Sequence, residues 1–189
     1  NSGHVRIYQN NSGTWSQIGS DIDGEAENDR SGQSVSLSSD GSTVAIGAYV
    51  NDGNGNTNDN RGHVRIYQNN SGTWSQIGSD IDSEDATDYF GTSVSLSGDG
   101  SIVAIGAHLN DGNGSNSGHV RIYQNIGGTW SQIRSDIDGE AAGDKSGTSV
   151  SLSGDGSIVA IGADQNGGNG TNSGHVRIYQ NNSGTWSQI

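Results

Sequence analysis

The sequence GHVRIYQN occurs four times, and this repetition constrains the fold more than any other feature of the chain. The four copies, which lie 59, 56 and 56 residues apart, begin at Gly3, Gly62, Gly118 and Gly174. A fixed period of this length is typical of arrays in which each repeat is one supersecondary unit packed on its neighbours. The extra residues of the first interval fall between Ala48 and His63, and a length change tolerated there indicates a surface loop.

Each unit contains four short runs separated by clusters of Gly, Asn, Asp and Ser, a pattern that predicts strands joined by turns. In the unit used as an example, the expected strands cover residues 93–97, 102–107, 119–125 and 129–133. The Asp-Gly pair between the first two runs predicts a hairpin. Because side chains alternate along a strand, Val94 and Leu96 should face one side while Ser93 and Ser95 face the other.

Side-chain size increases along the unit, from the Ser, Ala and Val of the first two runs to Tyr123 and Trp130 in the last two. A wedge-shaped blade needs small side chains near a crowded axis and large ones at the rim, so this gradient favours a propeller. No segment shows the apolar spacing of a helix. The sequence therefore predicts an all-β protein, a β-propeller of four-stranded antiparallel blades. The main alternative is a stacked β-solenoid, whose coils usually repeat at shorter intervals.

The blades form one continuous repeat array over residues 1–189. Counted from the SVSLS run, an outer half blade with its linker comes first and three blades follow, over residues 1–31, 32–89, 90–145 and 146–189. A closed ring normally needs about four to eight blades. We therefore expect the ring to be completed by more chain or by partner chains, and we favour a window on a longer array. Near-identical units would also allow register exchange between copies.

Composition limits the partners that we expect. The net charge is −13, and an acidic surface repels nucleic-acid phosphates and anionic membranes while it attracts cations. No stretch approaches the roughly 18 apolar residues that cross a bilayer. We therefore expect neither a nucleic-acid partner nor membrane insertion. Without Cys, a disulfide framework, a thiolate metal site and a cysteine nucleophile are all excluded.

An acidic linker follows the fourth run of each unit and reads DIDGEAEND, DIDSEDATD or DIDGEAAGD. Carboxylates at i, i+2, i+4 and i+8 can present several oxygens to one hard cation, which predicts a candidate calcium site. The alternative is a solvated acidic turn that keeps an exposed edge soluble. The candidate ligands are Asp21, Asp23, Glu25, Asp29, Asp80, Asp82, Glu84, Asp88, Asp136, Asp138, Glu140 and Asp144.

A second candidate cation loop follows the second run of each unit, although ordinary turn chemistry also explains its Asn and Gly residues. Its copies are Asp52, Asn54 and Asn56, then Asp111, Asn113 and Ser115, then Gly167, Asn169 and Thr171. The chain also carries Asn-X-Ser/Thr triplets, which permit surface glycosylation. These triplets begin at Asn10, Asn69, Asn113, Asn169 and Asn181.

One His and one Trp recur in every unit. The histidines His4, His63, His119 and His175 each precede an Arg by two residues. A metal-binding or catalytic histidine needs partners from other strands, so we expect these to pack and hydrogen-bond between blades. The tryptophans are Trp15, Trp74, Trp130 and Trp186. We expect them to fill the outer gap between neighbouring blades, the alternative being a rim that binds sugars or a partner.

The segment FGTSV (residues 90–94), followed by IGA (residues 105–107), resembles the FG-GAP repeat of integrin-α-type propellers. The degenerate bacterial version, with GHVRIY and TWSQIG strands, is especially similar, and the resemblance covers essentially the whole chain. It implies a propeller fold. Two features depart from the family pattern: Ser31 and Ser146 stand where the matching residue is Phe90, and no Pro completes a Gly-Ala pair.

Family members commonly bind calcium in an acidic loop between the first two strands of a repeat. Here that link contains a single acidic residue, Asp40, Asp99 or Asp155. One carboxylate is too few for a cage of about six to eight oxygens. The resemblance therefore does not carry calcium binding onto these positions.

We expect a non-catalytic module at the cell surface or outside the cell. It would be adhesive or structural, presenting many equivalent loops so that weak contacts add together, and a long array or an open fibre is one variant. Expected partners are copies of itself or further repeats, with a surface protein or glycan as other candidates. A lectin-like propeller is the main alternative. The chain has no G-x-S-x-G elbow, and we do not expect an enzyme.

Overall fold

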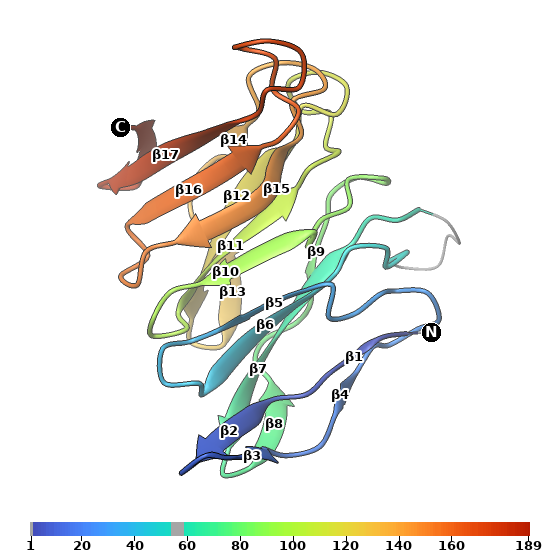
Figure 1. Ribbon diagram of the computed structural model, residues 1–189, viewed down its shortest axis with the longest axis vertical. Coiled ribbons are helices and arrows are strands. Elements are labelled where there is room, and N and C mark those ends of the chain that lie inside the picture. Colours follow the sequence, from blue (N-terminus) through green and yellow to red (C-terminus); the bar gives the residue numbers. More distant parts are fainter. Residues whose placement is uncertain (1, 54–58) are drawn as a thin grey trace.

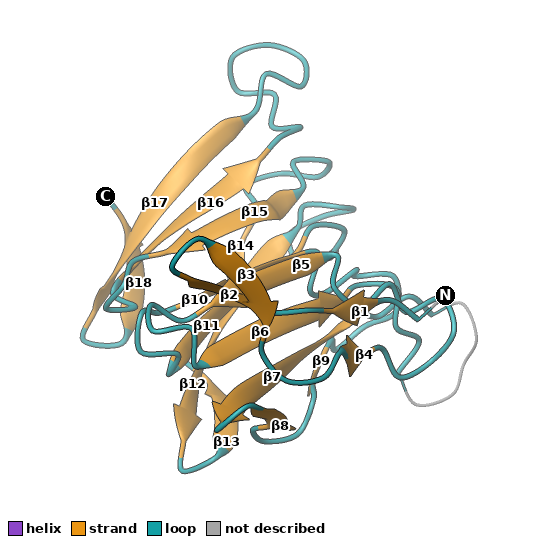
Figure 2. Ribbon diagram, turned by 60° about the horizontal axis from the view of Figure 1, so that its bottom comes forward, coloured by secondary structure: helices purple, strands orange, loops and turns teal. Residues whose placement is uncertain are grey.

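The chain folds into successive antiparallel sheets that fan out from a shared row of inner strands (Figure 1). The computed structural model describes residues 2–53 and 59–189. These residues form strands, turns and loops, without a helix among them (Figure 2). It follows that the described part of the chain has no helix long and apolar enough to span a membrane.

The first elements form a half blade of two small sheets. It consists of β1 (His4–Val5), β2 (Tyr8–Asn11), β3 (Thr14–Gln17) and β4 (Ile22–Asp23). Strand β1 pairs with β4, and β2 pairs with β3. These pairs match the outer part of the complete blades that follow.

Three complete blades come next, each a sheet in sequential antiparallel order. The first blade contains β5 (Ser34–Leu37), β6 (Thr43–Ala48), β7 (His63–Asn70), β8 (Thr73–Gln76) and β9 (Ile81–Asp82). The second contains β10 (Ser93–Leu96), β11 (Ile102–Ala107), β12 (His119–Ile126), β13 (Thr129–Gln132) and β14 (Ile137–Asp138). The third contains β15 (Ser146–Leu152), β16 (Ile158–Ala163), β17 (His175–Asn182) and β18 (Thr185–Gln188). The predicted all-β class and the four-stranded antiparallel blades are confirmed.

The linker after the fourth strand adds a short strand that the sequence analysis does not predict. In the first blade, β9 pairs with the start of β7, placing Ile81 opposite Val64 and Asp82 opposite His63. In the second blade, β14 pairs with β12 in the same register. The chain therefore turns back onto its own blade before it crosses to the next, and this return brings linker carboxylates beside the recurring histidine.

Apolar side chains fill three joints between neighbouring sheets. The first joint, between the half blade and the first blade, contains Ile7, Ile22, Val44 and Ile46. The second joint, between the first and second blades, includes Ile66, Phe90, Val94, Leu96 and Tyr123. The third joint, between the second and third blades, includes Val120, Ile122, Ile137, Val159 and Ile161. Each sheet thus buries its apolar face only against the next sheet, as a wedge in a propeller does.

The serines of the inner strands complete the joints on the side away from the apolar face. Ser93 Oγ donates to the Gly147 carbonyl of the third blade at 2.8 Å, and Ser95 Oγ accepts from Leu152 N at 2.9 Å. Strand β15 lies at the inner edge of its sheet, so this N–H lacks a strand partner and the serine satisfies it. The predicted alternation of apolar and serine faces is confirmed, because Val94 and Leu96 lie in the opposite joint.

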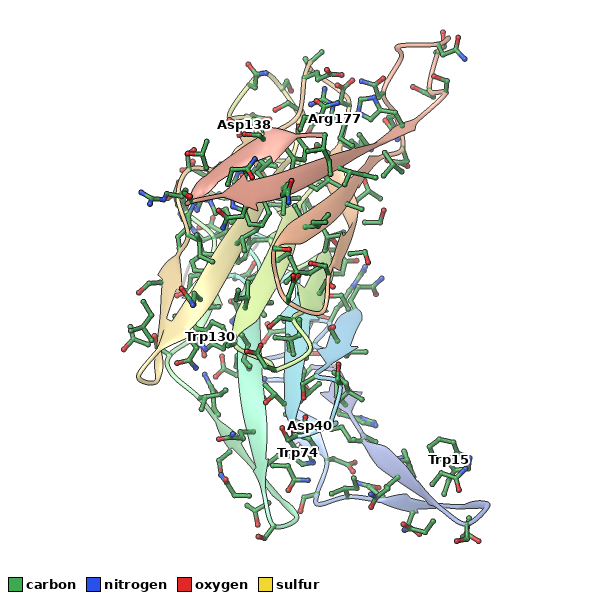
Figure 3. All side chains as sticks on the ribbon, turned by 90° about the vertical axis from the view of Figure 1, so that its left-hand side faces the viewer. Trp15, Asp40, Trp74, Trp130, Asp138 and Arg177 are labelled. Carbon is green, nitrogen blue, oxygen red and sulfur yellow. The ribbon has the colours of Figure 1, made fainter. Side chains whose placement is uncertain are left out.

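Tryptophans close the outer part of the joints. Trp74 Nε1 donates to the Ile18 carbonyl and Trp130 Nε1 to the Ile77 carbonyl, both at 2.9 Å and both across a joint. Trp186 packs at the third joint. Their predicted role in filling the gap between blades is confirmed. The prediction is wrong for Trp15, which stands apart on the half blade and is 65% exposed (Figure 3).

Candidate functional site

The first carboxylate of each linker is held within its own blade. Asp21 accepts from Arg6 Nε and Nη2 at 3.0 and 2.8 Å, and from Gln17 Nε2 at 2.8 Å. These hydrogen bonds to the charged form lower the pKa of Asp21 to about 2. Asp136 has the same partners in the second blade, Arg121 and Gln132.

Asp80, the matching residue of the first blade, is placed differently. It accepts from Gln76 Nε2 at 2.6 Å, and its Oδ2 lies 3.9 Å from His63 Nδ1. The neighbouring Arg65 turns instead toward the preceding linker. Its Nη1 lies 3.3 Å from Glu25 Oε1, and its Nη2 donates to the Asp23 carbonyl at 2.8 Å.

The glutamate of each linker therefore crosses a joint to the arginine of the next blade. The pairs are Glu25 with Arg65, Glu84 with Arg121, and Glu140 with Arg177. The side chains of Arg65 and Arg121 are almost fully buried, and a buried guanidinium needs such a partner. The glutamates thus act as charged ties between blades.

The last aspartate of each linker is buried and closes the linker loop. Asp88 Oδ2 accepts from Ser83 Oγ at 2.8 Å and from Asn110 Nδ2 at 3.1 Å. Asp144 accepts from Ala141 N and Asn166 Nδ2, and Asp29 from Ala26 N. The first, third and last carboxylates of a linker therefore have separate partners. Calcium binding by one linker stays a prediction.

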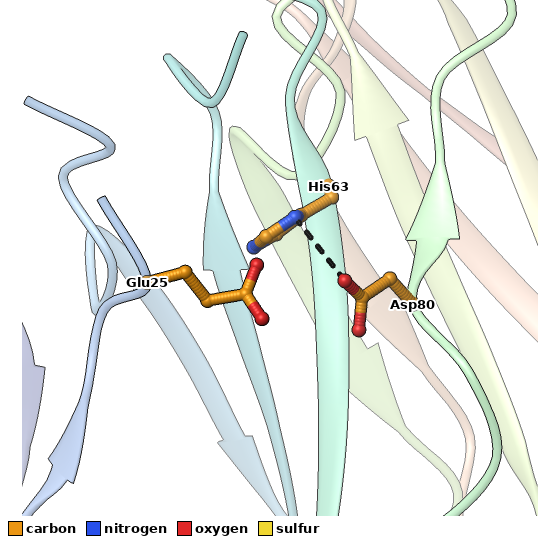
Figure 4. Close-up of side chains that lie close together, drawn as sticks. All are labelled: Glu25, His63 and Asp80. Atoms are coloured by element: carbon orange, nitrogen blue, oxygen red, sulfur yellow. Dashed lines mark ion pairs between the residues drawn. The ribbon is translucent and has the colours of Figure 1, made fainter. Parts of the chain in front are cut away.

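Two clusters bring linker carboxylates together with a buried imidazole. One consists of Glu25, His63 and Asp80, from two successive linkers and β7 (Figure 4). The other consists of His119, Asp136 and Asp138, all from the second blade. In each cluster, one ligand atom from every residue lies within 4.8 Å of the others, and both clusters can hold a metal ion.

Burial sets the protonation of the two imidazoles. It lowers the pKa of His63 and of His119, although Asp80 and Asp136 act in the opposite direction. Both rings are therefore neutral at pH 7, which is the form that binds metals. We expected these histidines to pack and hydrogen-bond between blades; both are buried, but Nε2 of each has no hydrogen-bond partner among the described residues, and their carboxylate neighbours were not expected. The D-I-D alternation was the available signal, because it is strand-like and places both aspartates on one face.

The hairpin between the first two strands uses its aspartate to fix the turn. Asp155 Oδ1 accepts from Ser153 Oγ at 2.6 Å and from Ser157 N and Oγ at 3.0 and 2.8 Å. These bonds lower the pKa of Asp155 to about 2. Asp40 and Asp99 make the corresponding contacts in the other blades. The carboxylate of this hairpin therefore stabilises its own turn.

The second candidate loop also shows turn chemistry. Asp111 Oδ1 accepts from Asn116 N at 2.7 Å, and Asn113 Nδ2 donates to the Gly139 carbonyl at 2.8 Å. Asp52 accepts from Asn60 N at 3.1 Å, while Asn54 and Asn56 lie outside the described residues. In the third copy, Gly167, Asn169 and Thr171 are exposed.

The sequon asparagines of the outer hairpins also take part in turns. In Asn10, Asn69 and Asn181, the side-chain Oδ1 accepts from the amide of the glycine three residues on, at 2.7 Å in each case. Asn113 and Asn169 lie in exposed loops. Glycosylation at the five positions stays a prediction.

Four side chains that differ between the units form a continuous row at the ends of the inner strands, which we call the aromatic row. It consists of Arg30, Tyr49, Tyr89 and His108. The guanidinium carbon of Arg30 lies 5.7 Å from the centre of the Tyr49 ring. Ring centres are 5.6 Å apart between Tyr49 and Tyr89, and 5.9 Å between Tyr89 and His108. The row crosses the second joint, and nothing in the sequence pattern predicts it.

Comparison with solved structures supports a propeller. The chain is similar to a structure from Bacteroides uniformis ATCC 8492, assigned provisionally as a 6-phosphogluconolactonase, with a TM-score of 0.66 and 12% identity over 100% of this chain and 48% of that one. A similarly assigned structure from Bacteroides fragilis NCTC 9343 gives a TM-score of 0.59 and 12% identity over 88% of this chain and 39% of that one. The chain spans about half the length of these proteins or less. At such identity the likeness concerns the fold alone.

Comparison with families and curated proteins gives two results. No curated protein matches the chain. The model of the FG-GAP repeat matches three segments, residues 21–67, 80–123 and 136–179, which together cover well over half of the sequence. Each segment runs from the D-I-D linker through the inner strands to the tyrosine of the third strand. The chain belongs to the FG-GAP repeat family.

Proposed function

We propose that this chain is a non-catalytic adhesive or structural module of an extracellular protein, in which the repeated residues hold the blades together and the aromatic row contacts a partner. The observation that carries the proposal is this division of roles between repeated and variable residues. It applies to units that are otherwise nearly identical in sequence.

Side chains shared by the units are engaged in the joints. Trp74 and Trp130 donate across a joint, Arg121 binds the preceding linker through Glu84, and Ser93 bonds to the next blade. Residues with these partners stabilise the fold and have little freedom to bind another molecule.

Side chains that differ between the units recur at one position of the repeat, beside the ends of the inner strands. Arg30, Tyr89 and Lys145 occupy the same position of successive repeats, and all three have positive φ, at 56°, 56° and 55°. A bulky residue is rare in this conformation, which glycine adopts without strain. A strained position that carries different large side chains in successive units suits recognition better than stability.

The end faces support further blades as partners. Val35 is 53% exposed on the first blade, whereas Val94 at the same position of the second blade is 8% exposed. Val176 is 66% exposed on the third blade, and the matching Val120 is fully buried. Exposed apolar faces that match an internal joint suit another FG-GAP blade, from further repeats or from a second copy.

Adhesion can be tested with beads that carry the chain at high density, because multivalent display makes weak contacts measurable. We expect retention on a surface coated with a second copy or on part of a glycan array. Tyr89→Ala and His108→Ala should reduce retention, and Trp15→Ala, an exposed aromatic outside the row, is the matched control. Equal retention of all variants would contradict a role for the row. Retention confined to defined glycans would favour a lectin-like module.

The non-catalytic part of the proposal has a direct test, suggested by the assignment of the two similar structures. The purified chain is incubated with 6-phosphogluconolactone and hydrolysis is followed against a blank. We expect the spontaneous rate. Turnover that is lost after a single His or Asp substitution would overturn the proposal.

Location and calcium need separate measurements. An antibody against the chain should label intact cells that produce it, and protease treatment of those cells should remove the label. Labelling only after permeabilisation would place the protein inside the cell.

For calcium, melting temperatures with millimolar calcium and with a chelator are compared, since a ligand of the folded state raises the transition. Equal values would remove calcium from the proposal.

A further inference from the structure

We propose that Glu25, His63 and Asp80 form a binding site for a divalent transition-metal ion of the zinc class, which ties the half blade to the first blade. Three separate segments supply the residues. Glu25 comes from the linker after β4, His63 from the start of β7, and Asp80 from the turn before β9 (Figure 4). An ion held by all three would cross the first joint.

The imidazole provides the first argument. The His63 side chain is only 3% exposed, and its Nε2 has no hydrogen-bond partner within the part of the chain that the structure describes. Its Nδ1 lies 3.9 Å from Asp80 Oδ2, beyond hydrogen-bond distance. Figure 4 shows the ring between the two carboxylates. A buried polar atom without a partner costs stability, and a metal ion bound at Nε2 would remove that cost.

The donor set provides the second argument. One neutral imidazole and two carboxylates are ligands that Zn²⁺ accepts in a four-coordinate site, with water in the fourth position. Imidazole also suits the neighbouring divalent ions of the first transition row. Calcium takes about six to eight oxygens, which three residues including a histidine do not supply. The proposed ion therefore differs in class from the calcium predicted for the acidic linkers.

The side chains that already hold the carboxylates distinguish this cluster from the second one. Arg121 already holds both oxygens of Asp136, through Nε at 3.0 Å and Nη2 at 2.9 Å. A cation at the second cluster would have to displace this bidentate pair. In the proposed site, Arg65 pairs with Glu25 and with the Asp23 carbonyl, and Asp80 binds the neutral amide of Gln76. Asp80 is therefore the more accessible ligand.

Among the residues that the structure describes, the other two units lack a complete set. His175 has Glu140 at 3.8 Å but is part-exposed, with 28% of its side chain accessible. His4 is exposed on the half blade, where Arg6 holds Asp21. These histidines occupy the same repeat position as His63, so they serve as matched controls within the same protein.

The experiment is a titration of the untagged, metal-free protein with ZnCl₂ by isothermal calorimetry and by thermal melting. We expect one tight site per chain and a raised melting temperature, whereas CaCl₂ at the same concentration gives neither effect. His63→Gln should abolish the tight site, and Glu25→Gln should weaken it at least tenfold. His175→Gln and His119→Gln should bind as the unchanged protein does.

A second measurement guards against loss of folding in the His63→Gln variant. Glu25→Gln keeps a side-chain oxygen that can accept from Arg65, and Arg65 keeps its bond to the Asp23 carbonyl, so this variant should keep the fold, which the melting curve without metal checks. Cobalt(II) provides a spectroscopic signature, since four-coordinate cobalt absorbs strongly in the visible and hydrated cobalt does not. Zinc binding that survives both substitutions, or an equal response to calcium, would overturn the proposal.

Discussion

The second and third joints are built from the same repeat, yet two residues that shape the second joint are replaced in the third. At the second joint, Phe90 is fully buried and meets Tyr123 edge-on, with ring centres 6.4 Å apart. At the third joint, the matching residue is Ser146. The second joint therefore contains a large apolar side chain that the third joint lacks.

The outer ends of the two joints differ as well. Gly78 lies against the Trp130 ring, where a Cβ atom would come within 2.9 Å of the indole, and Trp130 Nε1 bonds to the Ile77 carbonyl. The third joint has Arg134 in place of this glycine, at φ 69°. There, the buried Trp186 Nε1 has no hydrogen-bond partner among the described residues.

The comparison shows how a repeat array tolerates sequence drift. Each joint is a separate contact between neighbours, so an imperfect residue weakens one joint and leaves the others intact. The FG motif that gives the family its name is complete at only one joint, yet all three sheets form. The second and third joints still share a serine bond to the next blade, a buried apolar cluster and a packed tryptophan.

The largest expected difference between the joints is at the FG position. Phe90→Ala should lower the free energy of unfolding by about 3–5 kcal/mol, because it removes a fully buried aromatic side chain and leaves a cavity. Ser146→Ala should change it by less than about 1 kcal/mol, since only a hydroxyl is lost. Urea unfolding followed by tryptophan fluorescence measures both. Similar losses in the two variants would mean that the joints do not differ as described.

Exchanging glycine and arginine between positions 78 and 134 should reverse the difference in stability between the outer ends of the two joints. Arg134→Gly should stabilise the protein by about 1–2 kcal/mol, since glycine relieves the positive φ and lets Trp186 approach the Ile133 carbonyl. Gly78→Arg should destabilise it by about 1–3 kcal/mol, because it places a side chain against Trp130 and the Gly128 carbonyl. Thermal melting of the two variants measures both signs. A loss of stability in Arg134→Gly would show that the arginine makes a compensating contact.

Sequence reasoning reached the parts of the fold that depend on local pattern. Alternation along SVSLS predicted the apolar and serine faces, and the size gradient predicted that Trp74 and Trp130 close the joints. These features follow from side-chain period and volume, which a single repeat displays. The four-stranded antiparallel sheet of a unit followed from counting its runs.

The site was harder to predict because its residues meet through non-local contacts. His63 and Asp82 are opposite each other only because a two-residue strand returns to β7, and a strand that short has no reliable signal. Glu25 lies far from Arg65 in sequence and reaches it only when the blades pack. The aromatic row likewise depends on how successive blades are rotated, so no pattern in one unit could show it.

The indole hydrogen bond is a smaller difference between the second and third joints. Trp130→Phe should cost about 1 kcal/mol more than Trp186→Phe, because only the first substitution removes a bond to a carbonyl, while both remove similar apolar volume. Urea unfolding gives the two values. In the Arg134→Gly background the difference should disappear, and its persistence would show that the arginine does not cause it.

The hairpin turns of the second and third blades should differ least in stability, because Asp99 and Asp155 make the same hydrogen bonds. Both pKa values lie below the ordinary value of 3.8, and that of Asp155 is about 2, since the serine hydroxyls and amides bond to the charged form. A lowered folded pKa stabilises the protein above the ordinary value, and this contribution is lost as pH falls from 3.8 toward 2. Asp99→Asn and Asp155→Asn should therefore lower the melting temperature at pH 7 by similar amounts and differ little from the unchanged protein near pH 2. Melting curves across this range test the equality, and a deficit that stays constant down to pH 2 would show that the charge is not what stabilises the turn.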